Sequence, residues 1–236
     1  CFPELDAREQ SALVRRAFHS NGIGILEIGL AWFRKPEHFL RHTRVHGLEH
    51  VEAALQQGKG ILALGGHYSS LDLCGTLVTR FVDADVMQRD HNNPLLNAVM
   101  TRARERHYGV VLSARDLRGL LRQLRKNRTI WYATDQDYGR KGIVFAPFFG
   151  IDAASITATS RIAEHSGCAV LPFSHFRRST CGCIGASRPA PRRRIRTSIA
   201  TANSAALPLM VVSAPDLSTG VQPTPWHCLA PNCSSA

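Results

Sequence analysis

Short apolar runs alternate with amphipathic stretches through the first 178 residues, and this alternation is the feature that most constrains the fold. The runs have the length and composition of β-strands, and the stretches between them have helical periodicity. Strands that alternate with helices predict an α/β fold, in which a central mixed sheet carries helices on its faces. We expect strands at 60–65, 84–88, 109–112, 129–134, 143–146 and 168–173, helices at 7–19, 22–33, 70–81, 94–107, 117–126 and 155–166, and a connecting segment at 46–57.

An imidazole and a carboxylate directly follow one of these runs. The run 60–64 is closed by two glycines, after which come His67 and Asp72. Ligands of open α/β sheets bind at the carboxyl ends of the strands, so His67 is expected at the mouth of a site. Five residues of continuous helix turn the chain by about 500°, so we place His67 in the loop and Asp72 in the first turn of the next helix. We interpret the two as a dyad in which Asp72 orients His67, and His67 takes a proton from a substrate hydroxyl.

The same residues have two simpler interpretations. Ser69 and Asp72 have the spacing of a capping box, in which the carboxylate only satisfies backbone donors at the start of a helix. A serine-hydrolase site is disfavoured, because the sequence has no Gly-x-Ser-x-Gly elbow and its Ser69-Ser70 pair lies within the loop of the dyad itself.

Four further motifs follow in a fixed order. They lie at 89–96, which begins Arg-Asp-His-Asn-Asn-Pro, at 131–139 with Asp135, at 144–150 with Phe148, and at 170–173. Together with the His-x4-Asp motif, they resemble the lipid A biosynthesis acyltransferases, the lauroyl/myristoyl branch of the lysophospholipid acyltransferase superfamily. The resemblance covers residues 1–178 and implies a glycerolipid acyltransferase-like fold.

This resemblance also implies an activity and its partners. The enzyme would move a fatty acyl group from acyl carrier protein to a hydroxyl of a lipid A precursor, at the cytoplasmic face of the inner membrane. It would need no cofactor beyond the carrier protein thioester, which is a co-substrate, and no metal. The family's general base carries over to His67 and its acidic partner to Asp72. The substrate-binding residues that we predict are Arg104, with Arg102 and Arg106 as near alternatives, Asp135, Asp137, Arg89, Asn93 and Phe148.

Several of these residues also have a purely structural interpretation. The arginines between 102 and 106 suit a solvated helix face as well as a phosphate site. Asn93 suits a turn. Phe148 and its aromatic neighbours suit ordinary core packing as well as an acyl-chain groove.

Two other functions use different features of the chain. Asp135-x-Asp137 after an apolar strand is compatible with a metal-dependent glycosyltransferase, although that function leaves His67 unexplained. The formal charge of +11 favours an anionic partner. A non-catalytic protein that binds membranes or nucleic acid is therefore the second alternative, but no zinc-finger or RNP-type pattern accompanies the charge, and we predict no nucleic-acid partner.

The N-terminal region contains the most apolar segment of the chain, at 21–33. It is too short to span a bilayer and includes Glu27, so we expect it to pack on the domain or to lie at the surface of an anionic membrane. Family members usually begin with a membrane-anchoring helix, whereas this sequence begins at Cys1. We therefore expect that an N-terminal anchor is absent from the sequence, which would make it a fragment.

The composition changes abruptly after Arg178. Residues 179–236 have no Lys, Glu, Phe or Tyr, and they hold a basic cluster at 192–196 together with Cys181, Cys183, Cys228 and Cys233. The cysteine spacing does not suit zinc. We expect a disordered tail after an incomplete 1–178 acyltransferase domain. A lost reading frame explains this composition better than a lipid-binding basic tail does, and translation of the other two DNA frames after codon 178 tests it.

Overall fold

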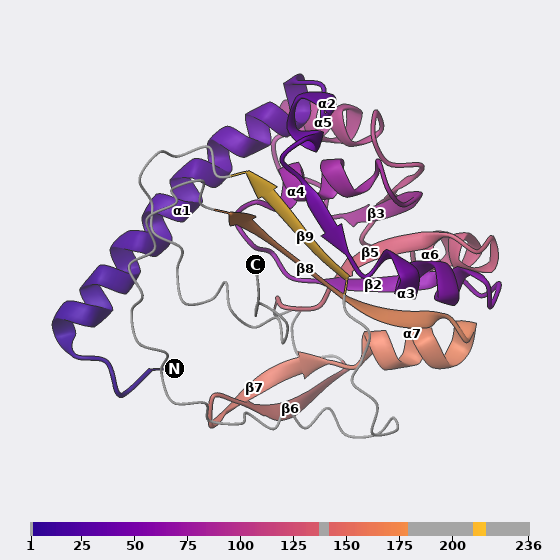
Figure 1. Cartoon of the computed structure of the whole chain (residues 1–236). Coiled ribbons are helices and arrows are strands. Elements are labelled where there is room, and N and C mark those ends of the chain that lie inside the picture. Colours follow the sequence, from indigo (N-terminus) through magenta and orange to yellow (C-terminus); the bar gives the residue numbers. More distant parts are fainter. Residues whose placement is uncertain (1, 137–141, 179–209, 216–236) are drawn as a thin grey trace.

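The computed structural model describes residues 2–136, 142–178 and 210–215. Its main sheet has the strand order β1-β9-β8-β2-β5-β3-β4 and is parallel except for the β1–β9 pair (Figure 1). The α/β prediction with a mixed central sheet is confirmed. The strands are β1 (Arg44–His46), β2 (Ile61–Gly65), β3 (Ala84–Gln88), β4 (Val111–Ser113), β5 (Thr129–Ala133), β8 (Ala169–Arg178) and β9 (Met210–Pro215).

Helices cover both faces of this sheet. Successive side chains of a strand point to opposite faces, so Ile61 and Ala63 of β2 pack on one side while Leu62 packs on the other. The first side is covered by α1 (Ala7–Phe33), α3 (Leu48–Leu55) and α4 (Leu71–Val78). The second is covered by α6 (Leu117–Arg125) and α7 (Ala158–Ser166). The remaining helices are α2 (Glu37–Leu40) and α5 (Pro94–Arg104).

The N-terminal region forms one long helix, whereas two helices were predicted. Asp6 and Glu9 form a reciprocal capping box at the start of α1. Gly22 lies within the continuous helix, and the Asn21 side chain donates to the carbonyl of Ala17 one turn earlier. The connecting segment predicted at 46–57 likewise contains α3.

A hairpin stands apart from the main sheet (Figure 1). The strand expected at 143–146 continues to Phe148 as β6 (Ile143–Phe148), which pairs antiparallel with β7 (Ile151–Ile156). Phe149 and Gly150 adopt positive φ angles and form the tight connection. The following helix, α7, therefore begins at Ala158 rather than at residue 155.

Within 179–236 the structure describes β9 alone, which lies between β8 and β1 in the sheet. The expectation of a segment without regular structure is therefore wrong for these six residues. The basic cluster at 192–196 and the cysteines at 181, 183, 228 and 233 lie outside the described residues. The lost reading frame stays a prediction. Among the described residues, no helix is long and apolar enough to cross a membrane.

Candidate active site

The loop after β2 brings His67 beside the end of a neighbouring strand. In the parallel β2–β5 pair, Gly65 lies opposite Ala133, and these residues end their strands. His67 and Asp135 each lie two residues further on, so the register alone places them side by side. This edge, formed by the carboxyl ends of parallel strands, is where open α/β sheets bind ligands.

His67 and Asp135 form the closest polar contact of the site. The ring Nδ1 of His67 lies 2.7 Å from Asp135 Oδ1, and the backbone N–H of His67 donates to Asp135 Oδ2 at 2.7 Å. Burial raises the pKa of the Asp135 carboxyl, but the backbone and ring contacts with His67 outweigh this effect and hold its pKa below the usual range. An ionised carboxylate only accepts hydrogen bonds, so the pair places the ring proton on Nδ1 and leaves Nε2 as an acceptor.

Asp72 pairs with an arginine rather than with His67, so the predicted His67–Asp72 hydrogen bond is wrong. Asp72 lies in the first turn of α4, as expected, but its Oδ1 accepts from Arg104 Nη2 at 2.9 Å and from Arg104 Nε at 3.2 Å. Arg104 also donates to Gln88 Oε1 at 3.2 Å. The reason is geometric: the start of α4 turns Asp72 toward α5, whereas the loop turns His67 toward β5. The capping interpretation fails too, because the helix cap is Ser70 and its side chain makes no capping bond.

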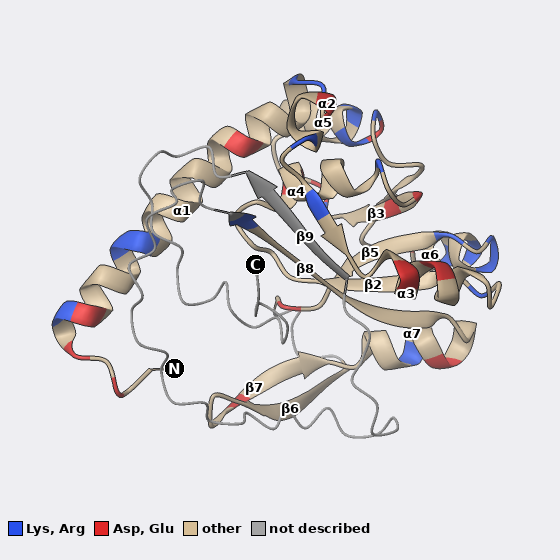
Figure 2. Cartoon of the chain, viewed as in Figure 1, with Lys and Arg blue, Asp and Glu red and all other residues tan. Residues whose placement is uncertain are grey.

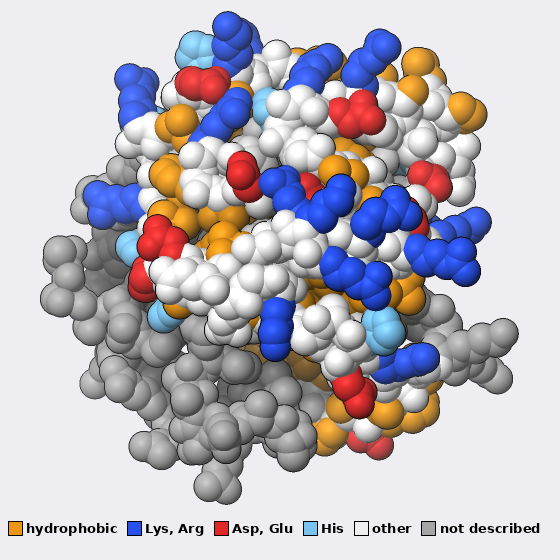
Figure 3. Space-filling model, turned by 90° about the vertical axis from the view of Figure 1, so that its right-hand side faces the viewer, with side chains coloured by type: hydrophobic (Ala, Val, Ile, Leu, Met, Phe, Trp, Pro, Cys, Tyr) orange, Lys and Arg blue, Asp and Glu red, His pale blue; other side chains and the backbone are white. Residues whose placement is uncertain are grey.

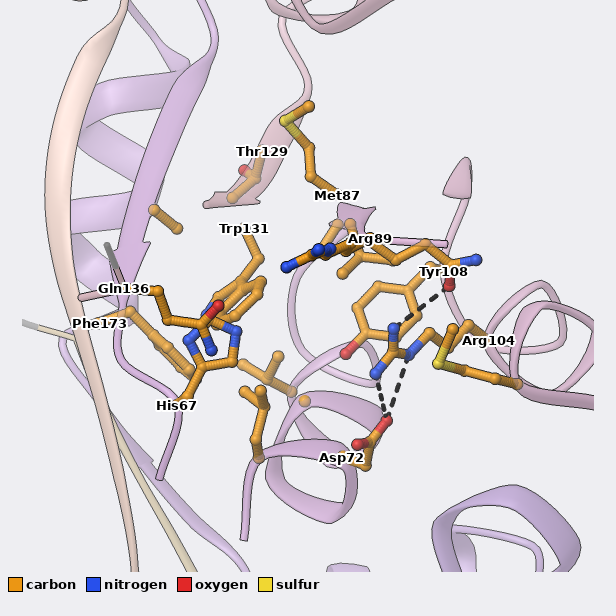
Figure 4. Close-up of a pocket in the computed structure, with 18 of the residues that line it drawn as sticks. His67, Asp72, Met87, Arg89, Arg104, Tyr108, Thr129, Trp131, Gln136 and Phe173 are labelled. Atoms are coloured by element: carbon orange, nitrogen blue, oxygen red, sulfur yellow. Dashed lines mark hydrogen bonds and ion pairs between the residues drawn. The ribbon is translucent and has the colours of Figure 1, made fainter. Parts of the chain in front are cut away.

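A cavity of about 490 Å³ opens between the sheet and α4. Figure 4 shows His67 and Asp72 at one end of it and Thr129, from the amino end of β5, at the other. Polar side chains line the mouth, among them His67, Asp72, Arg89, Arg104 and Gln136. Its interior is mostly apolar and is lined by Ala63, Leu71, Val78, Val82, Ala84, Val86, Met87, Trp131 and Phe173. A polar mouth on an apolar interior suits a ligand with a polar end and a hydrocarbon chain.

Comparison with known proteins assigns the chain to a family. The family model described as "Bacterial lipid A biosynthesis acyltransferase" matches residues 1–202. The chain belongs to this family. The chain is 34% identical over 180 residues to the lipid A biosynthesis palmitoleoyltransferase of Escherichia coli K12, which covers 76% of the chain and 59% of that protein. It is 36% identical over 174 residues to the lauroyltransferase of the same strain, covering 73% and 57%. A lipid A biosynthesis acyltransferase of Haemophilus influenzae is 34% identical over 179 residues, covering 75% and 57%.

The chain thus spans less than two thirds of the length of these lipid A acyltransferases. The family match confirms the resemblance that the motifs indicated, and it continues to residue 202, beyond the last of those motifs.

Only some of the predicted site residues line the cavity. His67, Asp72, Arg89 and Arg104 line the cavity, and Asp135 reaches it through His67. Asn93 and Phe148 do not line the cavity. Asn93 caps α5 by accepting from the backbone N–H groups of Leu95 and Leu96, and Phe148 is exposed on the hairpin against Phe149. Asp137 lies outside the described residues.

The two near alternatives to Arg104 lie elsewhere. Arg106 donates to the backbone oxygen of Trp32 at 3.0 Å, and Arg102 is exposed on α5. Arg104 alone of the three lines the cavity. Among the described residues, no group of three or more His, Cys, Asp or Glu side chains could hold a metal ion.

Several cavity residues were missed by the sequence interpretation, and three of them lie close to the predicted ones. Trp131 lies edge-on to the His67 ring, with centroids 5.7 Å apart, and Tyr108 and Gln88 lie beside Asp72 and Arg104. Burial raises the pKa of Tyr108, so its hydroxyl is protonated at neutral pH. Trp131 carried a signal, since the alternation of side chains along β5 places it on the opposite face of the sheet from Ile130 and Tyr132. Tyr108 and Gln88 carried none, because their proximity depends on the packing of α5 against α4 and β3.

Proposed function

We propose that this protein transfers a fatty acyl group from an acyl carrier protein thioester to a hydroxyl of a lipid A precursor. The observation that carries this proposal is the His67–Asp135 pair at the mouth of a deep apolar cavity. Membership of the lipid A acyltransferase family supports the same reaction class. The names of the relatives include lauroyl and palmitoleoyl transfer, which are both reactions of long acyl chains.

His67 is the general base in this proposal. Its Nε2 takes the proton of the acceptor hydroxyl as the hydroxyl oxygen attacks the thioester carbonyl carbon. The new C–O bond forms, the C–S bond breaks, and the proton passes from His67 to the departing thiolate of the carrier protein. Asp135 keeps the ring proton on Nδ1 and supports the imidazolium that forms between the two transfers.

The cationic side of the mouth is proposed to bind phosphate groups of the acceptor. Arg104 is held in place by Asp72 and Gln88, so its guanidinium is fixed before a ligand arrives. Arg89 is exposed at the same mouth. A planar guanidinium presents paired donors to a phosphate, which supports this role for both arginines.

The acyl chain is proposed to enter the apolar interior. A chain with its carbonyl at His67 would run past Trp131 toward Val82 and Ala84, along the length of β3 and β5 (Figure 4). The cavity is large enough for a lipid chain and has no charged lining at its far end.

We also propose that α1 lies on the anionic, cytoplasmic surface of the inner membrane. Phe18, Ile25, Leu26 and Phe33 are 69–75% exposed on the side of α1 opposite its buried residues. Arg15 lies on the same side, and Arg34 follows the end of the helix. Exposed apolar residues flanked by cations are typical of interfacial helices.

Replacement of Phe18 and Ile25 by Ser should lower binding to vesicles that contain phosphatidylglycerol by about tenfold, and unchanged sedimentation with the vesicles would contradict this.

Acyl carrier protein is the proposed acyl donor, and the charge of this chain supports an acidic partner. Figure 2 shows Lys and Arg on α6 and on the loops near α5, and Figure 3 shows Lys and Arg side chains spread over the face of the molecule on that side. Arg118, Arg122 and Arg125 are exposed on α6. Electrostatic attraction of this kind raises the rate of encounter with a carrier of opposite charge.

The test is an acyl-transfer assay with labelled acyl carrier protein and a lipid A precursor in membranes. Replacement of His67 by Ala should lower kcat by about 10²-fold or more, because the acceptor hydroxyl loses its base. The matched control is His165→Ala, which changes an exposed histidine on α7. A parent protein without transfer, or an active His67→Ala variant, would overturn the proposal.

A further inference from the structure

Three segments that are distant in the sequence meet behind the loop that carries His67. They are α1, the loop residue Ser69 and β8. Ser20 Oγ and Ser69 Oγ lie 3.0 Å apart, and Arg177 Nη2 donates to Ser69 Oγ at 2.8 Å. Arg177 also donates to the side chain of Ser20 at 2.8 Å and to its carbonyl at 2.9 Å. The catalytic loop is therefore tied to α1 and β8 two residues after His67.

A buried ion pair fixes the guanidinium that makes these contacts. Arg177 Nε donates to Glu27 Oε1 at 2.6 Å, and the side chains of Arg177 and Glu27 are only 10% and 1% exposed. Removing both charges from water costs much of what their attraction returns, so such a pair is a weak source of stability. It does fix directions, because the donors of a planar guanidinium diverge at set angles that Lys cannot reproduce. We call Ser20, Glu27, Ser69 and Arg177 the clamp.

Close packing of α1 against the loop accompanies the clamp. A Cβ atom at Gly24 would collide with the carbonyl oxygen of Ser69 and lie 3.1 Å from the Ser69 Cβ. Gly22 and Gly29 of the same helix have no atom within 4 Å of such a position. Gly24 therefore permits an approach of helix to loop that the other two glycines do not require.

We propose that the clamp and Gly24 position the catalytic loop, holding the backbone of residues 66–70 where His67 meets Asp135. This inference rests on the proposed function only for its effect on catalysis. The clamp residues do not line the cavity in the described part of the chain, so they are positioning residues and not catalytic ones. The backbone N–H of His67 donates to Asp135 Oδ2, and a small shift of the loop lengthens this bond together with the ring contact.

The test compares Gly24→Ala with the controls Gly22→Ala and Gly29→Ala. All three gain the same methyl group and the same helix propensity, but only the first presses on Ser69. Hydrogen exchange of the peptide that contains residues 66–70 is measured together with kcat, KM and the unfolding temperature. Gly24→Ala should accelerate exchange in this peptide at least threefold and lower kcat about tenfold, while KM for the carrier protein and exchange in α6 stay at their parent values.

A second variant keeps the test decisive if Gly24→Ala does not fold. Ser69→Ala removes one hydroxyl that bonds to Arg177 and Ser20, and Ser11→Ala, on the exposed part of α1, is its control. Arg177→Met should lower kcat more than Ser69→Ala does, and Arg177→Lys should not restore kcat to the parent value. Loop exchange at the parent rate in Gly24→Ala, or in Ser69→Ala where the first is unfolded, overturns the clamp whatever the activity. A parent without acyl transfer overturns the proposed function alone, because the exchange measurement still decides the clamp.

Discussion

At the scale of single residues, the acidic partner of His67 decides how the site works. The neighbouring carboxylate in sequence, Asp72, is bound to Arg104, and the more distant Asp135 contacts both the ring and the backbone of His67. In the proposed mechanism the two aspartates have separable roles, because Asp135 contacts the proposed base His67 and Asp72 contacts Arg104.

Replacement of these aspartates by Asn should separate the two roles. Asp135→Asn should lower kcat about 10²-fold, because an amide does not hold the His67 tautomer or support its charge. Asp72→Asn should mainly raise KM for the phosphorylated acceptor, because Arg104 loses its anchor. Steady-state kinetics with varied acceptor measure both effects, and the control is Asp152→Asn on β7. The reverse pattern would restore Asp72 as the partner of His67.

A buried histidine near the loop should make stability depend on pH. Burial lowers the pKa of His175 to about 4, the charge of Arg177 adds to this, and the backbone of Tyr68 opposes it. The unfolded chain binds a proton near pH 6.5, so between these values it holds more protons than the folded chain does. Stability present at pH 7 is therefore lost as the pH falls from 6.5 to 4, up to roughly 3 kcal/mol. Urea unfolding at several pH values gives the free energy of unfolding of the parent and of His175→Phe. Between pH 6.5 and 4 this free energy should fall more steeply with decreasing pH in the parent, and an equal dependence on pH in both proteins would contradict the prediction.

At the scale of elements, α5 illustrates how a predicted binding residue can have a structural role. Asn93 accepts from two backbone N–H groups, and Pro94 occupies the first turn of the helix. Both features are favourable at helix starts. The predicted helix start at 94 is therefore confirmed, and the same motif explains Asn93 without a substrate.

Removal of this cap should affect stability more than activity. Asn93→Ala should lower the free energy of unfolding by about 1 kcal/mol, whereas Asn93→Ser should retain most of the stabilisation by the cap. The transfer rate of both variants should stay within about twofold of the parent at a temperature where all are folded. Chemical unfolding and the acyl-transfer assay check the two parts, and a large loss of activity in Asn93→Ser would return Asn93 to the binding residues.

At the scale of the whole molecule, the cavity exists because several elements close it together. β2, β3, β5 and β8 supply one wall, α4 the opposite wall, and α5 and Tyr108 the side. Val82 and Ala84 lie at the amino end of β3, far from His67 along the strand direction. The length of this cavity is expected to limit the acyl chain.

Filling the far end should shift the preferred chain length. Ala84→Leu should lower transfer of long chains at least fivefold relative to chains shorter by four carbons, because the added atoms occupy the space of the terminal methylenes. The ratio of rates for two donors is measured in one variant, so a general loss of stability cancels. An unchanged ratio would show that the chain does not reach Ala84.

The sequence by itself determined most elements and the place of His67, the proposed base. Hydrophobic periodicity and the turn residues between elements are local signals. They correctly predicted the loop position of His67 and the strands at 60–65, 84–88 and 129–134. Local signals did not predict that α1 is continuous or that 210–215 joins the sheet, because these depend on what the segments pack against.

The tertiary structure decided which residues meet. His67 and Asp135 are 68 positions apart, Arg104 and Asp72 are 32 apart, and Arg177 and Glu27 are 150 apart. Each contact follows from which strands are neighbours and how far a helix approaches the sheet, and no periodicity in the chain encodes either. His67 and Asp72 are near in sequence, but the register of the β2–β5 pair places Asp135, at the end of another strand, in contact with His67.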